Sequence, residues 1–489
     1  MIAARRLLTR LALVLLAGLL PARAQSIPDY PVANLVLGQL LFTTNSASVP
    51  PNAASLATPY GISVDPVSGK VFVADTGNNR VLRYASAASL VNGATPEIVI
   101  GQVNFSSYTA NQGNVLTPSQ TSLSAPADVF VDATGRLWVA DTNNNRVLLF
   151  ENASNLFNTP FADRVYGQPD FGTATAAATQ SKLASPNGVC VDPAGTLWVA
   201  DTGSHRVMAW KIAAAIPNGM PADRVLGQAT FTTAVAATSQ TGLFSPRGIA
   251  ADDAHVWVAD SGSNRVVMYA NFPAINGAPA NLVLGQATYI ASTPATSATG
   301  MTSPTSVALF DGILYVADSG NNRVVSFADA EDLSNGGDAT GIIGQATFTT
   351  GSSGLSSQKI ALFNSHVGVD LDGNLFVADT LNNRALRFIA SVLPPVPPDP
   401  IIAPSVKING QKQITTTKKT FTLRGTAEGN PGIARVSYNQ NGVGYVYAKG
   451  TLNWHAKIRL EPGRNKIVVK AVALDGTVSP PKSVSITKK

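Results

Sequence analysis

Cysteine, histidine and charged side chains are all scarce in this sequence, and each scarcity narrows the classes of protein to which it can belong. The chain has one cysteine among 489 residues, Cys190, so an intramolecular disulfide is excluded. Charged residues make up 13% and hydrophobic residues 45%, which excludes a disordered chain and indicates a globular one. Four histidines leave little material for a histidine-rich metal centre.

Long apolar runs are absent after residue 24, so no membrane-spanning helix is expected there. The first 24 residues differ, because three arginines precede the apolar run 11–20 and an Ala-Arg-Ala sequence ends at Ala24. This order is typical of a secretory signal peptide, here cleaved before Gln25. The sequence therefore predicts an exported protein, either periplasmic or secreted.

What the sequence does contain is an internal repeat. The triplet Val-Ala-Asp occurs six times at spacings of 58 to 66 residues, and each copy has an Arg five residues after its Asp. The triplets begin at Val73, Val139, Val199, Val258, Val316 and Val377. Six copies of one unit at a steady spacing predict a six-bladed β-propeller, in which each unit supplies one sheet.

A second repeat, Gly-Gln-x-x-aromatic, alternates with the first. Its glycines are Gly38, Gly101, Gly167, Gly227, Gly285 and Gly344. The first Gly-Gln precedes any Val-Ala-Asp triplet, and no Gly-Gln follows the last triplet. If each blade ends in a Gly-Gln strand, the sixth blade must use the N-terminal strand 35–38. That exchange closes the ring and protects the sheet edges.

Short apolar runs rich in β-branched residues predict four strands in each unit. In the second unit these strands are expected at 127–132, 137–141, 146–150 and 163–167. Helical periodicity is absent from this region. The fold class predicted for residues 25–390 is therefore all-β.

The third unit carries a family resemblance. Its sequence Pro-Asn-Gly-Val-Cys-Val-Asp (186–192), followed by Leu-Trp-Val-Ala-Asp-Thr-Gly-Ser-His-Arg-Val (197–207), resembles the NHL repeat, and all six units match. The resemblance implies a six-bladed propeller that most often serves as a platform for protein, RNA or glycan. A minority of similar propellers are metal-dependent lyases or lactonases.

The repeat pattern ends after Phe388. The Pro-rich segment 391–403 is expected to be a stiff linker. Seven alternating segments then predict a small β-sandwich over 404–489. They are 405–408, 420–424, 434–438, 445–449, 454–460, 466–473 and 483–487. The sequence 454–476 resembles bacterial immunoglobulin-like modules of surface and carbohydrate-active proteins.

Charge divides along the same boundary. Residues 401–489 contain 15 Lys and Arg against 3 Asp and Glu, about +12, whereas residues 25–400 contain 16 against 26, about −10. An acidic propeller disfavours nucleic acid, which requires a basic face. The basic C-terminal domain favours contact with an anionic envelope polymer, although its lysines can equally serve only to keep the domain soluble.

The turn after each triplet repeats an Asp and an Arg five positions apart. These pairs are Asp75 and Arg80, Asp141 and Arg146, Asp201 and Arg206, Asp260 and Arg265, Asp318 and Arg323, and Asp379 and Arg384. Asp and Asn accept backbone N–H groups in tight turns, and the Arg can pair with the Asp across the loop. Because a catalytic role does not require six copies, we interpret these residues as structural.

Sixfold repetition breaks at the start of the innermost strands, where the predicted ligand-binding residues are Tyr60, Asp128, Asn187, Arg247, Thr305 and His366. In a propeller these positions ring one mouth of the channel. The loops leading to them, such as 103–125 and 229–245, are long, rich in Ser, Thr, Ala and Gly, and poor in charge. This composition favours a protein or glycan ligand over a phosphate.

An enzyme would need metal ligands or acid–base groups that converge on this mouth. His205, His255 and His366 occupy three different positions of the repeat, so a three-histidine zinc site is not expected. Asp128, Asn187 and His366 can form a small polar group, although separate surface roles are the simpler interpretation. Cys190, in the middle of an inner strand, is expected to be a buried, inert thiol.

The sequence thus predicts an exported, non-enzymatic scaffold that binds a protein or carbohydrate ligand at the propeller mouth, without a metal, cofactor or catalytic residue. Two alternatives stay open. One is a metal-dependent lactonase or lyase that uses Asp128, Asn187, Arg247 and His366, and the other is a structural component of an extracellular matrix. Nothing in the sequence indicates the oligomeric state.

Overall fold

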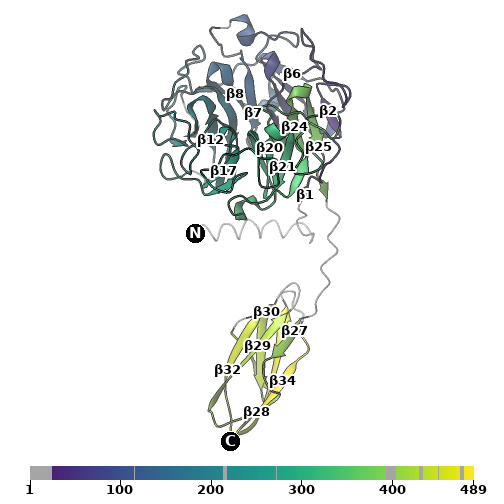
Figure 1. The fold of residues 1–489 in the computed structure, drawn as a ribbon, viewed down its shortest axis with the longest axis vertical. Coiled ribbons are helices and arrows are strands. Elements are labelled where there is room, and N and C mark those ends of the chain that lie inside the picture. The colour runs from purple at the N-terminus through teal and green to yellow at the C-terminus, as the bar shows by residue number, and fades with distance from the viewer. Residues whose placement is uncertain are drawn as a thin grey trace. The chain divides into compact units, whose positions relative to one another are not determined.

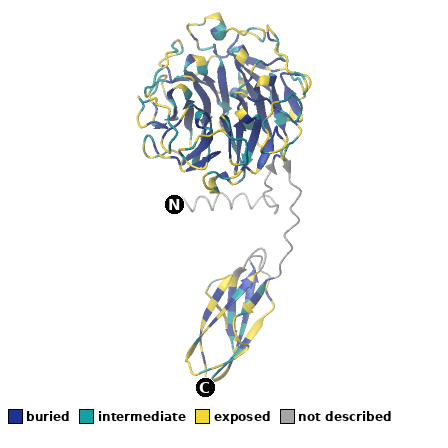
Figure 2. Ribbon diagram, in the orientation of Figure 1, coloured by how far each residue is buried: buried dark blue, intermediate teal, exposed yellow. Residues whose placement is uncertain are grey.

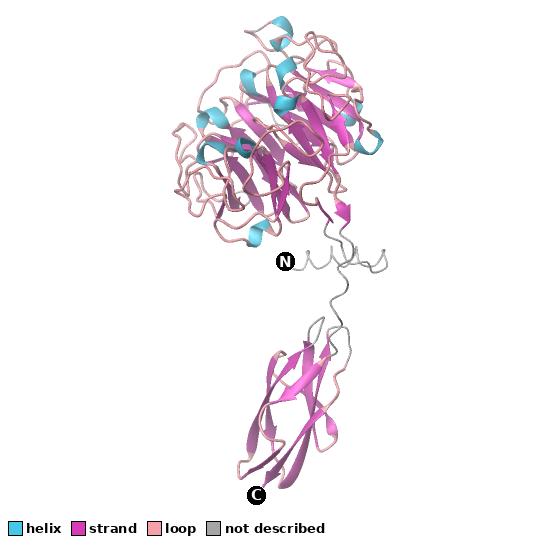
Figure 3. Cartoon of the chain, turned by 45° about the vertical axis from the view of Figure 1, so that its right-hand side comes forward, coloured by secondary structure: helices cyan, strands magenta, loops and turns pink. Residues whose placement is uncertain are grey.

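The computed structural model describes residues 25–114, 116–212, 217–270, 273–392, 404–428, 433–449, 451–473 and 478–489. The predicted signal peptide and nearly all of the predicted linker lie outside these residues. In the described chain the regular elements are strands and short 3₁₀ turns, without an α-helix, which confirms the all-β prediction (Figure 3). No described helix is long and apolar enough to cross a membrane.

Contacts divide the chain into two compact units, Met1–Val392 and Leu393–Lys489. In its described part, the first unit contains six four-stranded antiparallel sheets, numbered here 1 to 6 (Figure 1). The strands of each sheet are given from the inner one outward. Sheet 1 has β3 (Ile62–Val64), β4 (Lys70–Asp75), β5 (Arg80–Ser86) and β6 (Ile98–Ile100), sheet 2 has β7 (Pro126–Val131), β8 (Leu137–Asp141), β9 (Arg146–Phe150) and β10 (Arg164–Tyr166), and sheet 3 has β11 (Pro186–Val191), β12 (Thr196–Asp201), β13 (Arg206–Lys211) and β14 (Arg224–Leu226). Sheet 4 has β15 (Pro246–Ala251), β16 (His255–Asp260), β17 (Arg265–Ala270) and β18 (Leu282–Leu284), sheet 5 has β19 (Pro304–Phe310), β20 (Ile313–Asp318), β21 (Arg323–Phe327) and β22 (Gly341–Ile343), and sheet 6 has β23 (Val367–Val369), β24 (Leu375–Asp379), β25 (Arg384–Phe388) and β2 (Leu35–Leu37).

Each Val-Ala-Asp triplet ends the second strand of its sheet, and a one-turn 3₁₀ helix follows. These turns are η1 (Thr76–Asn78), η4 (Thr142–Asn144), η6 (Thr202–Ser204), η7 (Ser261–Ser263), η8 (Ser319–Asn321) and η10 (Thr380–Asn382). The remaining short turns are η2 (Ala87–Ser89), η3 (Ala110–Gly113), η5 (Ala153–Asn155) and η9 (Ala330–Asp332). A two-stranded pair, β1 (Gln25–Ser26) with β26 (Ser391–Val392), joins the two ends of the described first unit.

The inner strands contact one another in the cyclic order β3, β7, β11, β15, β19, β23 and back to β3. Apolar side chains of neighbouring sheets fill the space between them, so the strands are buried while the loops carry the exposed residues (Figure 2). The N-terminal strand β2 pairs with β25 as the outer strand of sheet 6, with Leu37 opposite Ala385. In sheet 2 the four strands lie within two residues of their predicted bounds.

The second unit has two sheets in its described residues, one ordered β27 (Ser405–Ile408), β29 (Thr420–Glu428), β32 (Asn453–Arg459), and one ordered β28 (Gln413–Thr416), β34 (Lys482–Lys488), β33 (Gly463–Ala473), β30 (Ile433–Gln440), β31 (Val443–Tyr447). Alternate residues of both sheets, such as Trp454, Ile458, Ile467 and Ile486, form one apolar core. The sequence analysis missed β28 (Gln413–Thr416), because Ile414 is its one apolar residue and gives no alternating pattern.

Candidate functional site

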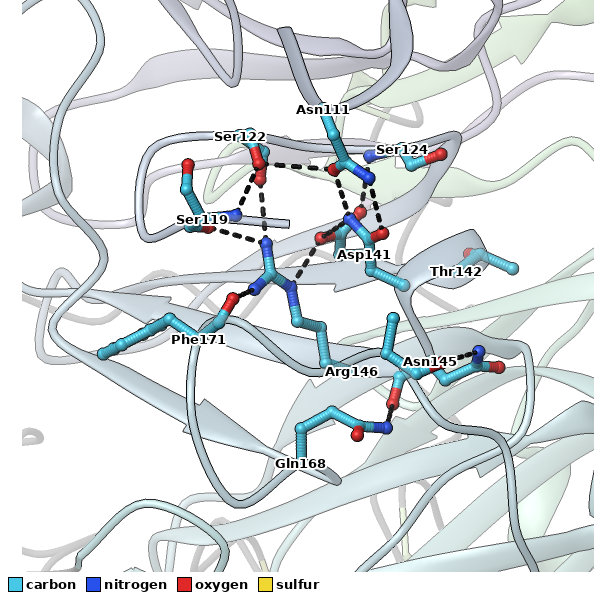
Figure 4. A network of polar contacts seen from close by, with 12 residues as sticks. Asn111, Ser119, Ser122, Ser124, Asp141, Thr142, Asn145, Arg146, Gln168 and Phe171 are labelled. Carbon is cyan, nitrogen blue, oxygen red and sulfur yellow. Dashed lines mark hydrogen bonds and ion pairs between the residues drawn. The ribbon is translucent and has the colours of Figure 1, made fainter. Parts of the chain in front are cut away.

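The six Asp–Arg pairs form buried ion pairs that tie each sheet to its loops. In sheet 2 the Nε of Arg146 lies 2.7 Å from Oδ2 of Asp141, and neither side chain is exposed (Figure 4). Asp141 also accepts the backbone N–H of Ser124 at 2.7 Å. The guanidinium donates to the carbonyls of Phe171, Ser119 and Ser122.

This network explains why the two sequence repeats occur together. Phe171 is the aromatic residue of a Gly-Gln-x-x-aromatic motif, and its carbonyl accepts from the Arg of the preceding triplet. The Gln of the same motif, Gln168, donates to the carbonyl of Asn145 (Figure 4) and to that of Thr175. Carbonyl groups carry no sequence signal, so this link was not predictable from residue types.

The residue before each Arg joins one sheet to the next. Asn145 has a left-handed conformation, φ +53°, and its Oδ1 accepts the N–H of Ser185, 40 residues away. In sheet 3 the same position holds His205, whose Nδ1 accepts the N–H of Ser245 at 3.1 Å. Burial lowers the pKa of His205, in keeping with this acceptor role.

The structure brings three of the predicted site residues into direct contact. The Nδ1 of His366 lies 3.2 Å from Oδ1 of Asp128, and its Nε2 lies 3.0 Å from Oδ1 of Asn187. These residues come from sheets 6, 2 and 3, so the contact spans the space between the inner strands. All three are buried, which corrects the expectation of separate surface roles.

Both ring nitrogens of His366 and both carboxylate oxygens of Asp128 have a polar neighbour within this group or on the backbone. Asp128 also accepts the backbone N–H of Val189 through Oδ2 at 3.0 Å. The two ring nitrogens of His366 thus face oxygen atoms of Asp128 and Asn187, and the histidine bridges sheets 2 and 3.

Two further predicted residues, Tyr60 and Arg247, lie half-buried near this group. Arg247 has no hydrogen-bond or ion-pair partner within the described ranges. Burial lowers the pKa of the Arg247 guanidinium. The electrostatic influence of Tyr60, which comes from a non-neighbouring sheet, raises the same pKa. The ring of Tyr60 meets that of Phe363 edge to face, with centroids 6.4 Å apart.

Phe363 is a site residue that the sequence analysis missed. Its side chain is 53% exposed beside Tyr60. It belongs to the loop before β23, where sheet 6 departs from the proline found in the other units. The missing proline was the feature of the sequence that could have pointed to this loop.

Thr305 does not have the exposed position expected of a ligand-binding residue. It is buried, and its hydroxyl bonds the Ser319 hydroxyl at 2.6 Å and donates to the Ser365 carbonyl at 2.7 Å. The contact with Ser319 lies within sheet 5, whereas the contact with Ser365 holds sheet 5 against sheet 6. Thr305 therefore stabilises the packing of sheets and does not offer its hydroxyl to a ligand.

A central cavity of about 500 Å³ lies between the inner strands of all six sheets. Its wall is mainly apolar, with Asp128, Ser306 and His366 among the few polar lining residues. Tyr60, Asn187, Arg247 and Thr305 are not in the lining. These four residues precede, along the chain, the cavity-lining residues of the same sheets.

Cys190 lies in the wall of the central cavity and is buried. Burial raises the pKa of its thiol, and the neighbouring carboxylates of Asp192 and Asp128 act in the same direction. A thiol held in its protonated form is a poor nucleophile.

One group of His, Asp and Glu in the described residues has ligand atoms within 4.8 Å of one another, namely Asp252, His255 and Glu331. It lies outside the central cavity. His255 Nδ1 is 3.5 Å from Asp252 Oδ1 and 3.2 Å from Glu331 Oε2. The Asp252 Oδ1 also accepts the N–H groups of Ala254 and His255, so it holds the β15–β16 hairpin turn.

No curated protein matches the chain. Three solved structures illustrate the likeness: a streptogramin B lyase (11% identity, TM-score 0.39, covering 71% of this chain and 96% of that one), a virginiamycin B lyase from Staphylococcus aureus (10%, 0.38, 70% and 98%), and a protein of unknown function from Bacteroides thetaiotaomicron (11%, 0.45, 73% and 76%).

A family match agrees with the repeat analysis. The NHL repeat matches residues 56–84, 123–150, 183–209 and 301–327. Each matched stretch begins close to an inner strand and ends in the third strand of the same sheet. The first unit of this chain therefore contains NHL repeats in these four stretches, and its four-stranded sheets are consistent with a β-propeller.

Proposed function

We propose that the chain is an exported, non-enzymatic binding protein whose propeller recognises a protein or carbohydrate ligand at the surface that carries Tyr60, Arg247 and Phe363. The observation that carries this proposal is the guanidinium of Arg247, which is half-buried and has no partner in the described chain. A partly desolvated guanidinium favours a carboxylate or another planar anion. The Tyr60 and Phe363 rings beside it supply apolar contact area.

The environment of Asp128, Asn187 and His366 supports binding over catalysis. A general acid or base must reach a substrate proton, but the ring nitrogens of His366 and the carboxylate oxygens of Asp128 are already engaged with Asn187, with each other and with the Val189 N–H. The alternative, a metal-dependent lactonase or lyase that uses these residues and Arg247, requires the bridge to open.

The proposal includes a propeller of six blades that closes on itself. Three contacts support closure: β2 pairs with β25, β3 contacts β23, and the Thr380 hydroxyl donates to the Pro59 carbonyl at 2.6 Å, 321 residues away. A closed ring holds Tyr60 and Arg247, from sheets 1 and 4, at a fixed separation. Fixed groups recognise a ligand at low entropic cost.

We assign the second unit, an immunoglobulin-like β-sandwich in this proposal, to contact with an anionic envelope polymer. Residues 401–489 carry 15 basic and 3 acidic residues, and this excess of positive charge favours such a polymer over a neutral one. Export by the signal peptide 1–24 would bring both units to the envelope.

The test is a capture screen of the mature protein against arrays of acidic and neutral glycans and peptides. Arg247→Ala should weaken binding of the selected ligand by roughly tenfold or more, and Tyr60→Ala should weaken it to a smaller extent. Arg164→Ala, on the outer strand β10, is the matched control. Unchanged capture in Arg247→Ala would overturn the proposal.

Elemental mass spectrometry of the dialysed protein tests the enzymatic alternative. One tightly bound divalent ion per chain, lost in Asp128→Asn and His366→Gln, would favour the lactonase or lyase and justify assays of both reactions. If no ligand is captured and the protein instead forms insoluble assemblies, the result would favour the third function, a structural component of an extracellular matrix.

A further inference from the structure

The outward face of the five-stranded sheet in the second unit carries two exposed tyrosines. Tyr445 and Tyr447 are 47% and 69% exposed and lie two residues apart on β31. This strand pairs with β30 on one side and is the edge of its sheet. Residues at this spacing point to the same side of a strand, roughly 7 Å apart. The two rings therefore form one short aromatic strip.

Two cations lie over these rings. The Nζ of Lys470 is 3.9 Å from the ring centre of Tyr445, and the Arg435 guanidinium carbon is 5.7 Å from that of Tyr447. Register places Ser437, a small residue, between Tyr447 and Lys470 on the same face. Cation–π contacts of this kind hold long side chains in place at the surface.

The charge on this face has one sign. Strand register adds Arg464 and Lys466 of β33 to the same side as Lys470. The five strands β28, β34, β33, β30 and β31 contain no Asp or Glu. Val436, Ile467 and Val469 alternate with these residues and point into the core, so the cations and the tyrosines share the solvent side.

We infer that this face is a binding site for an acidic polysaccharide. The apolar faces of sugar rings pack on Tyr445 and Tyr447, and the carboxylates of the polymer pair with Arg435, Lys470, Lys466 and Arg464. Charge complementarity supports a polyanion, and the exposed aromatic pair supports one built of rings. The inference rests on the proposed anionic-polymer contact of the second unit and locates it on one sheet face.

The experiment measures binding of the full mature protein to polygalacturonate, with dextran as the neutral polymer. Arg435→Gln with Lys470→Gln should weaken binding about tenfold and flatten its salt dependence. Arg424→Gln with Lys457→Gln removes the same charge from exposed positions of the opposite sheet and should change binding less than about twofold. Thermal unfolding of each variant checks that the fold is retained.

A second pair of variants tests the aromatic strip. Tyr445→Ala with Tyr447→Ala should weaken binding to polygalacturonate, whereas Tyr445→Phe with Tyr447→Phe should retain it, because ring area is kept. Dextran should show no binding in any variant.

The outcomes separate this inference from the proposed function. If both charge variants lost the same amount of affinity for polygalacturonate, the site assigned to this sheet face would be wrong. The contact between the polymer and the second unit would then be diffuse. Absence of binding by the unmodified protein would reject the polymer contact as well. Tighter binding to single-stranded oligothymidylate would reassign the strip to nucleic acid, and self-association lost in the Tyr→Ala variant would reassign it to a second copy of the chain.

Discussion

At the residue scale, the most repeated interaction of the propeller is a fully buried ion pair. Asp141 and Arg146 are unexposed, and the guanidinium satisfies three carbonyls in addition to the carboxylate. A buried pair is not by itself a strong source of stability, because desolvation offsets the attraction. Removing one partner is costly, since the other charge is then left buried and unpaired.

Asp141→Asn is therefore expected to lower the free energy of unfolding of the first unit by about 3–5 kcal/mol. Glu151→Gln, at an exposed position in the same sheet, should change it by less than about 0.5 kcal/mol. Urea unfolding followed by tryptophan fluorescence measures both. A loss in Asp141→Asn as small as that of the control would contradict the structural role of the repeated pair.

His205 gives the first unit a dependence on pH. Its Nδ1 must stay unprotonated to accept from Ser245, and its pKa is lowered in the folded protein. The folded state thus binds this proton less readily than the unfolded state. The stability contributed by the contact is present above the ordinary histidine pKa of about 6.5 and is lost as pH falls through the folded value.

The matching variant is His205→Asn, which restores the residue found at this turn position in the other five sheets. Between pH 7.5 and pH 5, the melting temperature of the unmodified protein should fall by about 1 °C or more beyond that of the variant. Differential scanning fluorimetry across pH measures the difference. Identical pH profiles would show that His205 does not titrate on unfolding.

At the element scale, the position of β2 depends on a contact with a distant part of the chain. It pairs with β25, some 350 residues later in the chain, and both of its faces are buried. Val36 packs into the core that includes Ile343 and Leu386, while Leu35 and Leu37 face the core of sheet 1. The side chains of the short strand β2 thus pack into two apolar cores, one on each face of the strand.

Val36→Asp should therefore lower the free energy of unfolding by more than about 3 kcal/mol, because a charge is buried without a partner. Val32→Asp, four residues earlier and 59% exposed, is the control and should be nearly neutral. Chemical denaturation measures both variants, with light scattering as a readout of exposed sheet edges. Equal stability of the two variants would argue against the β2–β25 pairing.

At the scale of the whole molecule, the chain consists of two units with separate cores. Independent cores predict two unfolding transitions in calorimetry. Trp454→Ala removes a buried side chain from the core of the second unit and should lower only one transition, by an amount that corresponds to about 3–5 kcal/mol. A shift of both transitions would show that the two units unfold as one.

The sequence by itself determined the elements of the propeller. The Val-Ala-Asp and Gly-Gln repeats predicted the sheets, their strand order and the use of an N-terminal strand in sheet 6, because these patterns depend on local conformation and on strand periodicity. It also predicted the Asp–Arg pairs, whose members are five residues apart. In the second unit, β28 is the described strand that the sequence analysis did not predict.

Only the tertiary structure decided what the site residues do. His366 meets Asn187 from 179 positions away, and Thr305 lies buried against Ser319 and Ser365. Whether Arg247 has a partner depends on which side chains the other sheets present to it. The contacts with Asn187 and Ser365 are made between different sheets. A one-dimensional pattern encodes the conformation of each strand but not which distant side chains its packing brings within hydrogen-bond distance.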